Sequence, residues 1–195
     1  MVEKETSVRA FLAVEIPQRV RKHVWRIVED EKQKDLPIKW VKLENMHITL
    51  KFLGEIDEKQ QANISLAVKQ IAGQHESFAV NLKDIGCFPD PKYPRVLWVG
   101  VEKGNEALCT LAREIDEQLV RLGFKQEKRF HPHLTIARMR KPCVINHILE
   151  QSIATDTFKA EAIVLFKSTL TPQGPIYEPL ERYPLKKYRS DGVSE

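Results

Sequence analysis

The most informative feature of this 195-residue sequence is a four-residue pattern that occurs twice. Residues 47–50 read His-Ile-Thr-Leu, and residues 133–136 read His-Leu-Thr-Ile. On a β-strand, residues two apart point to the same face. Each segment is therefore predicted to present a histidine and a threonine on one face, with two aliphatic side chains directed to a core on the other.

Two such His–Thr pairs suit acid–base chemistry at a phosphodiester. One imidazole removes a proton from an attacking water while the other protonates the departing ribose oxygen, because a histidine pKa near 6.5 makes both steps feasible near neutral pH. The threonine hydroxyls would donate hydrogen bonds to the non-bridging oxygens as charge develops on the phosphate. This chemistry needs no metal, and the sequence shows no dense carboxylate cluster to hold one, so we expect no cofactor.

Two other interpretations of these residues stay open. A single His-x-Thr segment is usually structural, although two copies in equivalent positions are much less common by chance. His131 and His133 also form a His-x-His pair of the kind that binds zinc, but no third ligand is obvious nearby in the sequence. We expect His131 to be a second polar group at the rim of the cleft instead.

The elements that carry the two segments are themselves repeated. At a shift of about 86 residues His47 falls on His133, and at a shift of about 80 Phe78 falls on Phe158. Apolar periodicity predicts the order strand–helix–strand–helix–strand in each half. The predicted elements are strands at 8–16, 46–53 and 78–88 with helices at 18–34 and 57–72, then strands at 95–101, 129–137 and 158–170 with helices at 105–122 and 142–153.

This duplication predicts one α/β domain with two similar lobes related by a pseudo-twofold axis, which would place equivalent strands on either side of one groove. The domain is expected to span residues 1–195, with repeat halves at about 8–88 and 95–170 and an extended C-terminal segment at 171–189. Gly54 is expected to end the first histidine strand. Pro132 indicates an edge position or a bulge in the second.

The composition excludes several classes of protein. Hydrophobic residues make up 42% and charged residues 30%, which is typical of a globular domain and not of a disordered chain. No run approaches the roughly 18 apolar residues of a membrane span, and the charged start lacks the apolar core of a signal peptide, so we expect a cytoplasmic protein without a membrane anchor. Three widely spaced cysteines, Cys87, Cys109 and Cys143, are typical of reduced thiols.

The longer stretches around both histidines resemble a known family. WVKLENMHITLKFLGEI and RFHPHLTIARM are similar to the two signature motifs of the two-histidine (2H) phosphoesterases. From about Ser7 to Leu185, the chain resembles the LigT-like RNA 2′,3′-cyclic phosphodiesterases, long called 2′-5′ RNA ligases. FLAVEIP, RVLWVGV and LFKSTLTPQGPIYEPLERYPL support the resemblance.

The resemblance implies a bilobal α/β (α+β) fold in which two antiparallel sheets line a central groove, with helices on the outside. It implies hydrolysis of RNA 2′,3′-cyclic phosphate ends to 2′-phosphate ends without metal or ATP, and reversible 2′-5′ RNA ligation in vitro. The expected partners are such RNA ends, tRNA fragments among them, and the expected state is a monomer. In the family's assignment His47 is the proton donor, His133 the proton acceptor, and Thr49 and Thr135 bind the phosphate; the pseudo-symmetry leaves the order of donor and acceptor open in the sequence itself.

Other side chains near the motifs are candidates for RNA contacts. Lys51 is expected on the face of His47 and Thr49, and a basic cluster surrounds the second motif, although a net charge of only +4 permits an RNA partner without requiring one. Aromatic side chains nearby are candidates for stacking on a base. The candidates are Lys51, Phe130, His131, Arg138 and Arg140, then Lys125, Lys128, Arg129 and Lys141 of the basic cluster, and Trp40 and Tyr93 for stacking.

Two further functions remain open at this point. One is a related 2H phosphodiesterase that acts on a small cyclic nucleotide or cyclic-phosphate metabolite, and the other is a non-catalytic RNA-binding module. A pure binding module has no need of two imidazoles. The length of the groove and the charge of its rim distinguish an RNA substrate from a small one.

Overall fold

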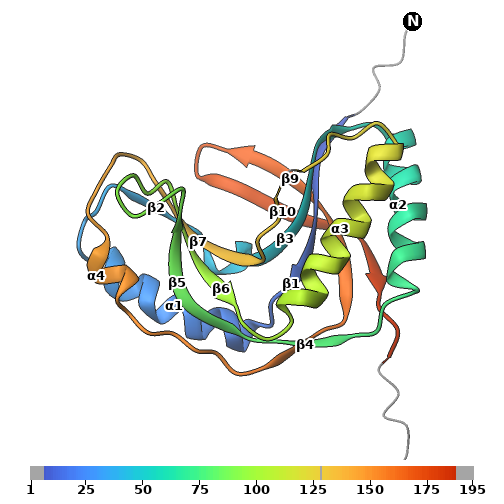
Figure 1. Ribbon diagram of the computed structural model, residues 1–195. Helices are drawn as coiled ribbons and strands as arrows, with labels where there is room; N and C mark the ends of the chain where they lie inside the picture. Colours follow the sequence, from blue (N-terminus) through green and yellow to red (C-terminus); the bar gives the residue numbers. More distant parts are fainter. Residues whose placement is uncertain (1–6, 128, 188–195) are drawn as a thin grey trace, which may run out of the picture.

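An antiparallel sheet of eight strands forms the centre of the computed structural model, which describes residues 7–127 and 129–187 (Figure 1). Across the sheet the strands are β10 (Gly174–Pro184), β9 (Ala162–Thr171), β1 (Val8–Glu15), β3 (His47–Ile56), β7 (His133–Met139), β6 (Val96–Val101) and β5 (Leu82–Phe88), and β2 (Ile38–Trp40) also pairs with β7. The strands β4 (Phe78–Val80) and β8 (Phe158–Ala160) form a separate antiparallel pair.

The large sheet consists of two four-stranded halves joined at one residue pair. Among the described residues, Ile48 and Leu134 are the only partners between β3 and β7. They are also equivalent residues of the repeat, so the pseudo-twofold axis passes through this pair. Ala79 and Lys159, at the centre of the β4–β8 pair, lie on the same axis for the same reason. The predicted duplicated α/β fold with two antiparallel sheets is thus confirmed.

Each half contributes its last long strand to the sheet of the other half. β5 belongs to the first half of the chain but pairs with β6, the first strand of the second half. β9 belongs to the second half but pairs with β1. Neither half of the chain therefore completes its own sheet, and the two sets of strands hold one another in place.

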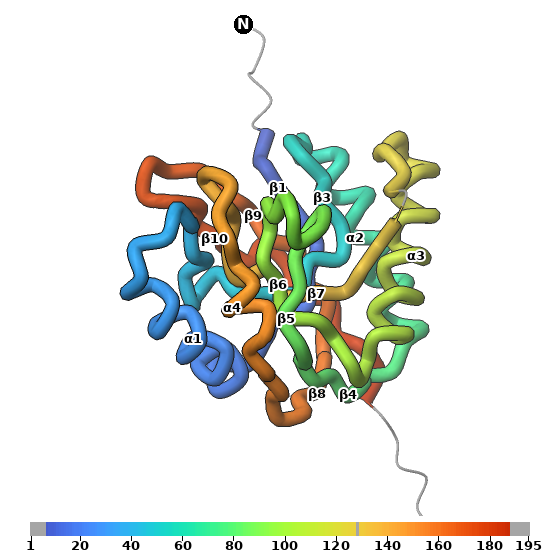
Figure 2. Tube along the Cα trace, turned by 60° about the vertical axis from the view of Figure 1, so that its left-hand side comes forward, coloured from blue at the N-terminus to red at the C-terminus, as the bar shows by residue number. Residues whose placement is uncertain are grey.

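The helices lie outside the sheet in two groups (Figures 1 and 2). α2 (Glu58–Ala72) and α3 (Asn105–Arg121) lie side by side, and α1 (Gln18–Lys32) and the short α4 (Asn146–Leu149) lie at the other side. α2 begins with a capping box, in which the Gln60 N–H donates to the Asp57 carboxylate at 2.7 Å and the Asp57 N–H donates back to the Gln60 side chain at 3.0 Å. No described helix has the length and hydropathy needed to cross a membrane.

The predicted helix at 142–153 is wrong except for the single turn of α4. Val144, which would lie on the apolar face of such a helix, is 76% exposed. The chain after α4 instead runs along β5, where the Asp84 N–H donates to the carbonyl of Ile153 and the Thr155 N–H donates to that of Leu82. These backbone hydrogen bonds require an extended segment. The short apolar pattern at 142–153 does not favour a helix strongly enough to prevent them.

Several strand boundaries also differ from the sequence prediction. β3 continues through Gly54, whose φ of 75° suits a glycine, and ends at Ile56. β7 begins only at His133, so Pro132 precedes the strand instead of marking an edge or bulge within it. The predicted strands 78–88 and 158–170 are each divided by one residue, which allows β4 and β8 to pair with each other. Residues 188 and 189 of the predicted extended segment lie outside the described residues.

We predict that Leu134→Ala lowers the free energy of unfolding by about 2–5 kcal/mol, because it removes a fully buried side chain where the two halves of the sheet join. Urea denaturation measures the change. Leu66→Ala is the matched control, since Leu66 is 70% exposed on α2 and its truncation should change stability by less than about 0.5 kcal/mol. Equal effects of the two substitutions would contradict a structural role for the joint.

Candidate active site

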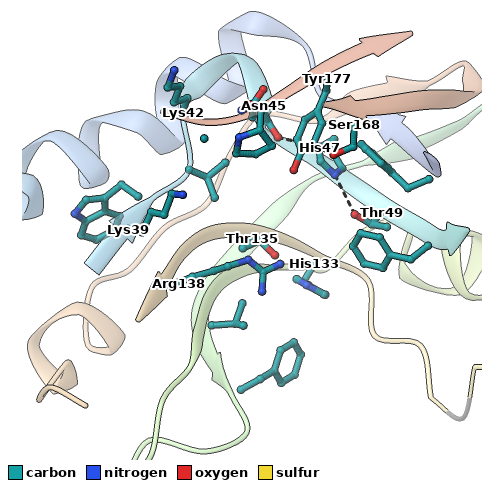
Figure 3. A pocket seen from close by; sticks show the side chains of 18 of the residues that line it. Lys39, Lys42, Asn45, His47, Thr49, His133, Thr135, Arg138, Ser168 and Tyr177 are labelled. Atoms are coloured by element: carbon teal, nitrogen blue, oxygen red, sulfur yellow. Dashed lines mark hydrogen bonds between the residues drawn. The ribbon is translucent and has the colours of Figure 1, made fainter. Parts of the chain in front are cut away.

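The two His–Thr pairs converge on one groove of about 1390 Å³. His47 and Thr49 reach it from β3, and His133 and Thr135 reach it from β7 on the opposite wall (Figure 3). All four side chains are half-buried, whereas Ile48, Leu50, Leu134 and Ile136 between them are buried in the core. The structure thus brings together the four residues that the repeated motif singles out.

The two imidazoles are held in the same way. Nδ1 of His47 lies 2.8 Å from the carbonyl oxygen of Asn45, and Nδ1 of His133 lies 2.6 Å from that of His131. A carbonyl only accepts, so each Nδ1 carries the hydrogen and donates it. Each Nε2 is then left as the atom that exchanges a proton. In His47, Nε2 lies 3.0 Å from the Thr49 hydroxyl, which donates to it when the ring is neutral (Figure 3).

Burial keeps both rings neutral. Removal from water lowers the pKa of His47 from 6.5 to about 4; its bond to Asn45 opposes this shift, and the charge of His133 adds to it. Burial also lowers the pKa of His133, with the charges of His131 and Arg138 acting in the same direction.

Aromatic side chains supply this burial on both sides of the groove. Phe11 stacks on His47 with ring centroids 4.7 Å apart, and Tyr177 meets the same ring edge-on at 5.3 Å. Phe88 meets His133 edge-on at 5.2 Å, and Trp98 packs against His131 at 5.1 Å. These contacts fix the orientation of each ring as well as its dielectric surroundings.

A β-bulge follows the threonine of each motif and decides which later side chains reach the groove. On β3 the extra residue is Leu50, and on β7 it is Ile136. A bulge reverses the alternation of faces beyond it. Phe52 and its pseudo-twofold equivalent Arg138 therefore line the groove as exposed side chains, while Lys51, which also borders the groove, is only 3% exposed and its equivalent Ala137 is fully buried.

Lys51 borders the groove, but the contact with RNA expected for its charge needs correction. Its side chain is only 3% exposed, and its ammonium group donates to the Asp116 carboxylate on α3 and, at 2.6 Å, to the carbonyl of Lys125. Asp116 also accepts the N–H of Glu127 at 3.1 Å. The charge expected to meet RNA is thus neutralised inside the protein, where it ties the first motif strand to the chain that leads into the second motif.

The other predicted contacts divide into two groups. Phe130, His131, Arg138 and Arg140 line the groove, as do Arg129 and Trp40, whereas Lys125, Lys141 and Tyr93 do not. Lys128 lies outside the described residues. The sequence prediction did not include several residues that line the groove. Two of them, Lys39 and Lys42, could have been recognised as a basic pair from their Lys-x-x-Lys spacing after the first helix. The missed residues include Arg9, Lys39, Lys42, Phe52 and Tyr177.

The zinc interpretation depends on a third ligand beside His131 and His133. Within residues 7–127 and 129–187, no three His, Cys, Asp or Glu side chains form a group that could hold a metal ion. The three cysteines are free thiols, and burial raises the pKa of each. The described donors therefore do not complete a zinc site of the usual four-ligand kind.

Comparisons with known proteins agree on one family. The family model described as LigT-like phosphoesterase matches residues 14–98 and again residues 99–177. The RNA 2′,3′-cyclic phosphodiesterase of Methanocaldococcus jannaschii is 40% identical over 183 residues, which cover 90% of this chain and 99% of the relative. The enzyme of that name from Methanothermobacter thermautotrophicus is 37% identical over 184 residues, covering 92% and 100%. The crystal structure of Escherichia coli LigT complexed with 3′-AMP has a TM-score of 0.74 and 27% identity, covering 92% of this chain and 99% of that one.

The depressed pKa of His47 predicts a specific dependence of stability on pH. The unfolded chain binds a proton near pH 6.5 and the folded protein only near pH 4, so stability falls as the pH drops through this window and is unaffected by His47 above it. The full effect is about 3 kcal/mol. His47→Gln cannot bind the proton, and urea denaturation at several pH values should show a flatter profile than the wild type. Parallel profiles would contradict the shift.

The Lys51–Asp116 pair predicts a double-mutant result. Lys51→Met leaves the Asp116 carboxylate without its cation and should lower the free energy of unfolding by about 3–5 kcal/mol. Adding Asp116→Asn should recover part of the loss, because a neutral amide needs no counter-charge and its oxygen still accepts the Glu127 N–H. A double variant less stable than Lys51→Met would show that charge is not the reason for the pairing.

Proposed function

This chain belongs to the LigT-like phosphoesterase family, as the motifs predicted, and from that premise we propose that it hydrolyses RNA 2′,3′-cyclic phosphate ends to 2′-phosphate ends without a metal. The observation that carries the proposal is the pair of imidazoles on opposite walls of one groove, each with Nδ1 bound to a carbonyl and Nε2 left for proton transfer. The name of the relatives, RNA 2′,3′-cyclic phosphodiesterase, agrees with this chemistry.

In the proposed reaction His133 is the base and His47 the acid, following the family's assignment. Nε2 of His133 takes a proton from water as the water oxygen bonds to phosphorus. The bond from phosphorus to O3′ breaks, and Nε2–H of His47 delivers its proton to O3′, which leaves a 2′-phosphate. With a 5′-hydroxyl in place of water, the same transfers form a 2′-5′ linkage, which is the ligation expected in vitro.

The substrate itself supplies the charge that makes His47 an acid. In the free protein this ring is neutral at pH 7, with its Nε2 bound to the Thr49 hydroxyl. An anionic phosphate placed between the rings favours the protonated form and raises the pKa. Thr49 is then free to donate its hydroxyl to a non-bridging oxygen, as Thr135 does from the other wall, while Arg138 compensates the negative charge.

The size and charge of the groove favour RNA over a small cyclic nucleotide. Its volume of about 1390 Å³ exceeds the roughly 300–1,000 Å³ of typical small-molecule sites. Seven of the cationic side chains that line it are not ion-paired to any described carboxylate, so they are available to phosphates along a strand. These are Arg9, Lys32, Lys39, Lys42, Arg129, Arg138 and Arg140.

The decisive experiment measures turnover of an oligonucleotide that ends in a 2′,3′-cyclic phosphate. His47→Ala and His133→Ala should each lower kcat by about 10²–10⁴, the usual contribution of one positioned acid or base. Thr49→Val and Thr135→Val should cost about 1–3 kcal/mol in transition-state binding. The control is His23→Ala, an exposed histidine on α1 outside the groove, which should leave turnover unchanged.

Two parallel measurements separate this function from its alternatives. EDTA should leave turnover unchanged, whereas a loss restored by zinc would favour the His131–His133 metal site. Oligonucleotide affinity should stay close to wild type in both histidine variants, because the cationic side chains that contact phosphates remain. Full turnover in both alanine variants would disprove the two-histidine mechanism, and loss of binding together with turnover would make the histidines substrate ligands only.

A further inference from the structure

The two ends of the groove differ in chemistry although the pseudo-twofold axis relates them. We call the end beside β2 and the end of β7 the β2 end, and the opposite end the far end. The β2 end is lined by Lys39, Lys42, Arg138 and Arg140 together with Asp35 and Trp40, and the far end by Arg9, Phe52, Glu127, Arg129 and Phe130. Both ends thus carry an aromatic ring and one acidic side chain, but among the described residues the β2 end has four unpaired cations and the far end has two.

The difference is sharpest at the two positions that the bulges turn into the groove. Arg138 occupies one of them and Phe52, which is 59% exposed, occupies the other. The two residues are equivalent in the repeat, so an arginine at one end replaces an aromatic ring at the other. The groove therefore has a direction that the duplicated fold alone would not give it.

Lys39 and Arg138 form a pair that the fold by itself does not explain. They are direct cross-strand partners on β2 and β7, and both are exposed and line the groove. Like charges placed directly opposite one another destabilise an antiparallel pair. In the part of the chain that the structure describes, no carboxylate lies within 4.0 Å of either cation or of the nearby Lys42. An anion between them would remove this repulsion.

We propose that Lys39 and Lys42, beside Arg138, form a second phosphate site that binds the internucleotide phosphate next to the reactive RNA end. This inference rests on the proposed function and adds the path of the strand to it. Figure 3 shows Lys39, Lys42 and Arg138 together on one side of the histidine pair, opposite Thr49. The RNA strand accordingly leaves the catalytic centre toward the β2 end.

This path agrees with the roles of the two histidines. In the antiparallel pairing centred on Ile48 and Leu134, His47 lies one residue toward the β2 end, and His133 lies one residue toward the far end. The departing O3′ belongs to the ribose of the bound strand and so faces His47. The water attacks in line with that bond, from the side of His133. The distribution of charge thus supports His47 as the acid independently of the family's assignment.

The test compares two dinucleotides that both end in a 2′,3′-cyclic phosphate, one with a normal internucleotide phosphate and one with a neutral methylphosphonate in its place. The wild-type protein should prefer the charged linkage in kcat/KM on the order of tenfold. The double variant Lys39→Ala, Lys42→Ala should reduce this ratio to about one. Lys59→Ala with Lys69→Ala makes the same change in net charge on exposed positions of α2 outside the groove, and it should keep the wild-type ratio.

Three results would overturn the second site: no preference in the wild type, a full preference in the Lys39/Lys42 variant, or loss of the preference in an Arg9→Ala, Arg129→Ala variant instead. The last result would place the strand at the far end. If the wild type hydrolyses neither dinucleotide, the proposed function fails, but the site is still tested by affinity. The two linkages are then compared in dinucleotides ending in a 2′-phosphate, and equal dissociation constants in the wild type would reject the site.

Discussion

The backbone pairing of Ile48 with Leu134 is the contact on which the whole site depends. It lies on the pseudo-twofold axis, and it is where β3 and β7 join the two halves of the sheet. Because side chains alternate along a strand, pairing at this residue buries both aliphatic side chains and presents a histidine on each side of the axis to the groove. The exchange of β5 and β9 between the halves then holds the two strands in this register. The geometry of two separate motifs is thus determined by a single shared joint.

The second constraint is electrostatic. Aromatic packing withdraws both imidazoles from water, while a carbonyl bound to each Nδ1 sets the same tautomer in both. Because both rings are neutral in the free protein, their protonation responds to an arriving anion. Under the proposed function, the phosphate of the substrate is therefore the group that turns one ring into an acid. Cations along the groove increase the attraction for that phosphate.

Duplication supplies two histidines, but the useful differences between the halves arose where the copies diverged. At equivalent positions Lys51 makes a buried ion pair where Ala137 makes none, and Phe52 stands where Arg138 stands in the second copy. The first difference ties the two motifs together through Asp116. The second, under the proposal made above, gives the RNA strand its direction. A fully symmetric groove would bind a strand in two opposite orientations and leave the roles of its histidines undefined.

The sequence by itself determined the local features: which residues of each motif share a face, and the alternation of strands and helices along both halves apart from the helix predicted at 142–153. These features follow from periodicity and from interactions between residues close in the sequence, and both can be predicted from the sequence alone. Only the tertiary structure decided the bulges after Thr49 and Thr135, the burial of Lys51, the replacement of a predicted helix by the single turn of α4, and the pairing of Lys39 with Arg138. Each of these depends on which strand or helix lies opposite, and alternation along one segment contains no information about the register or identity of a distant partner.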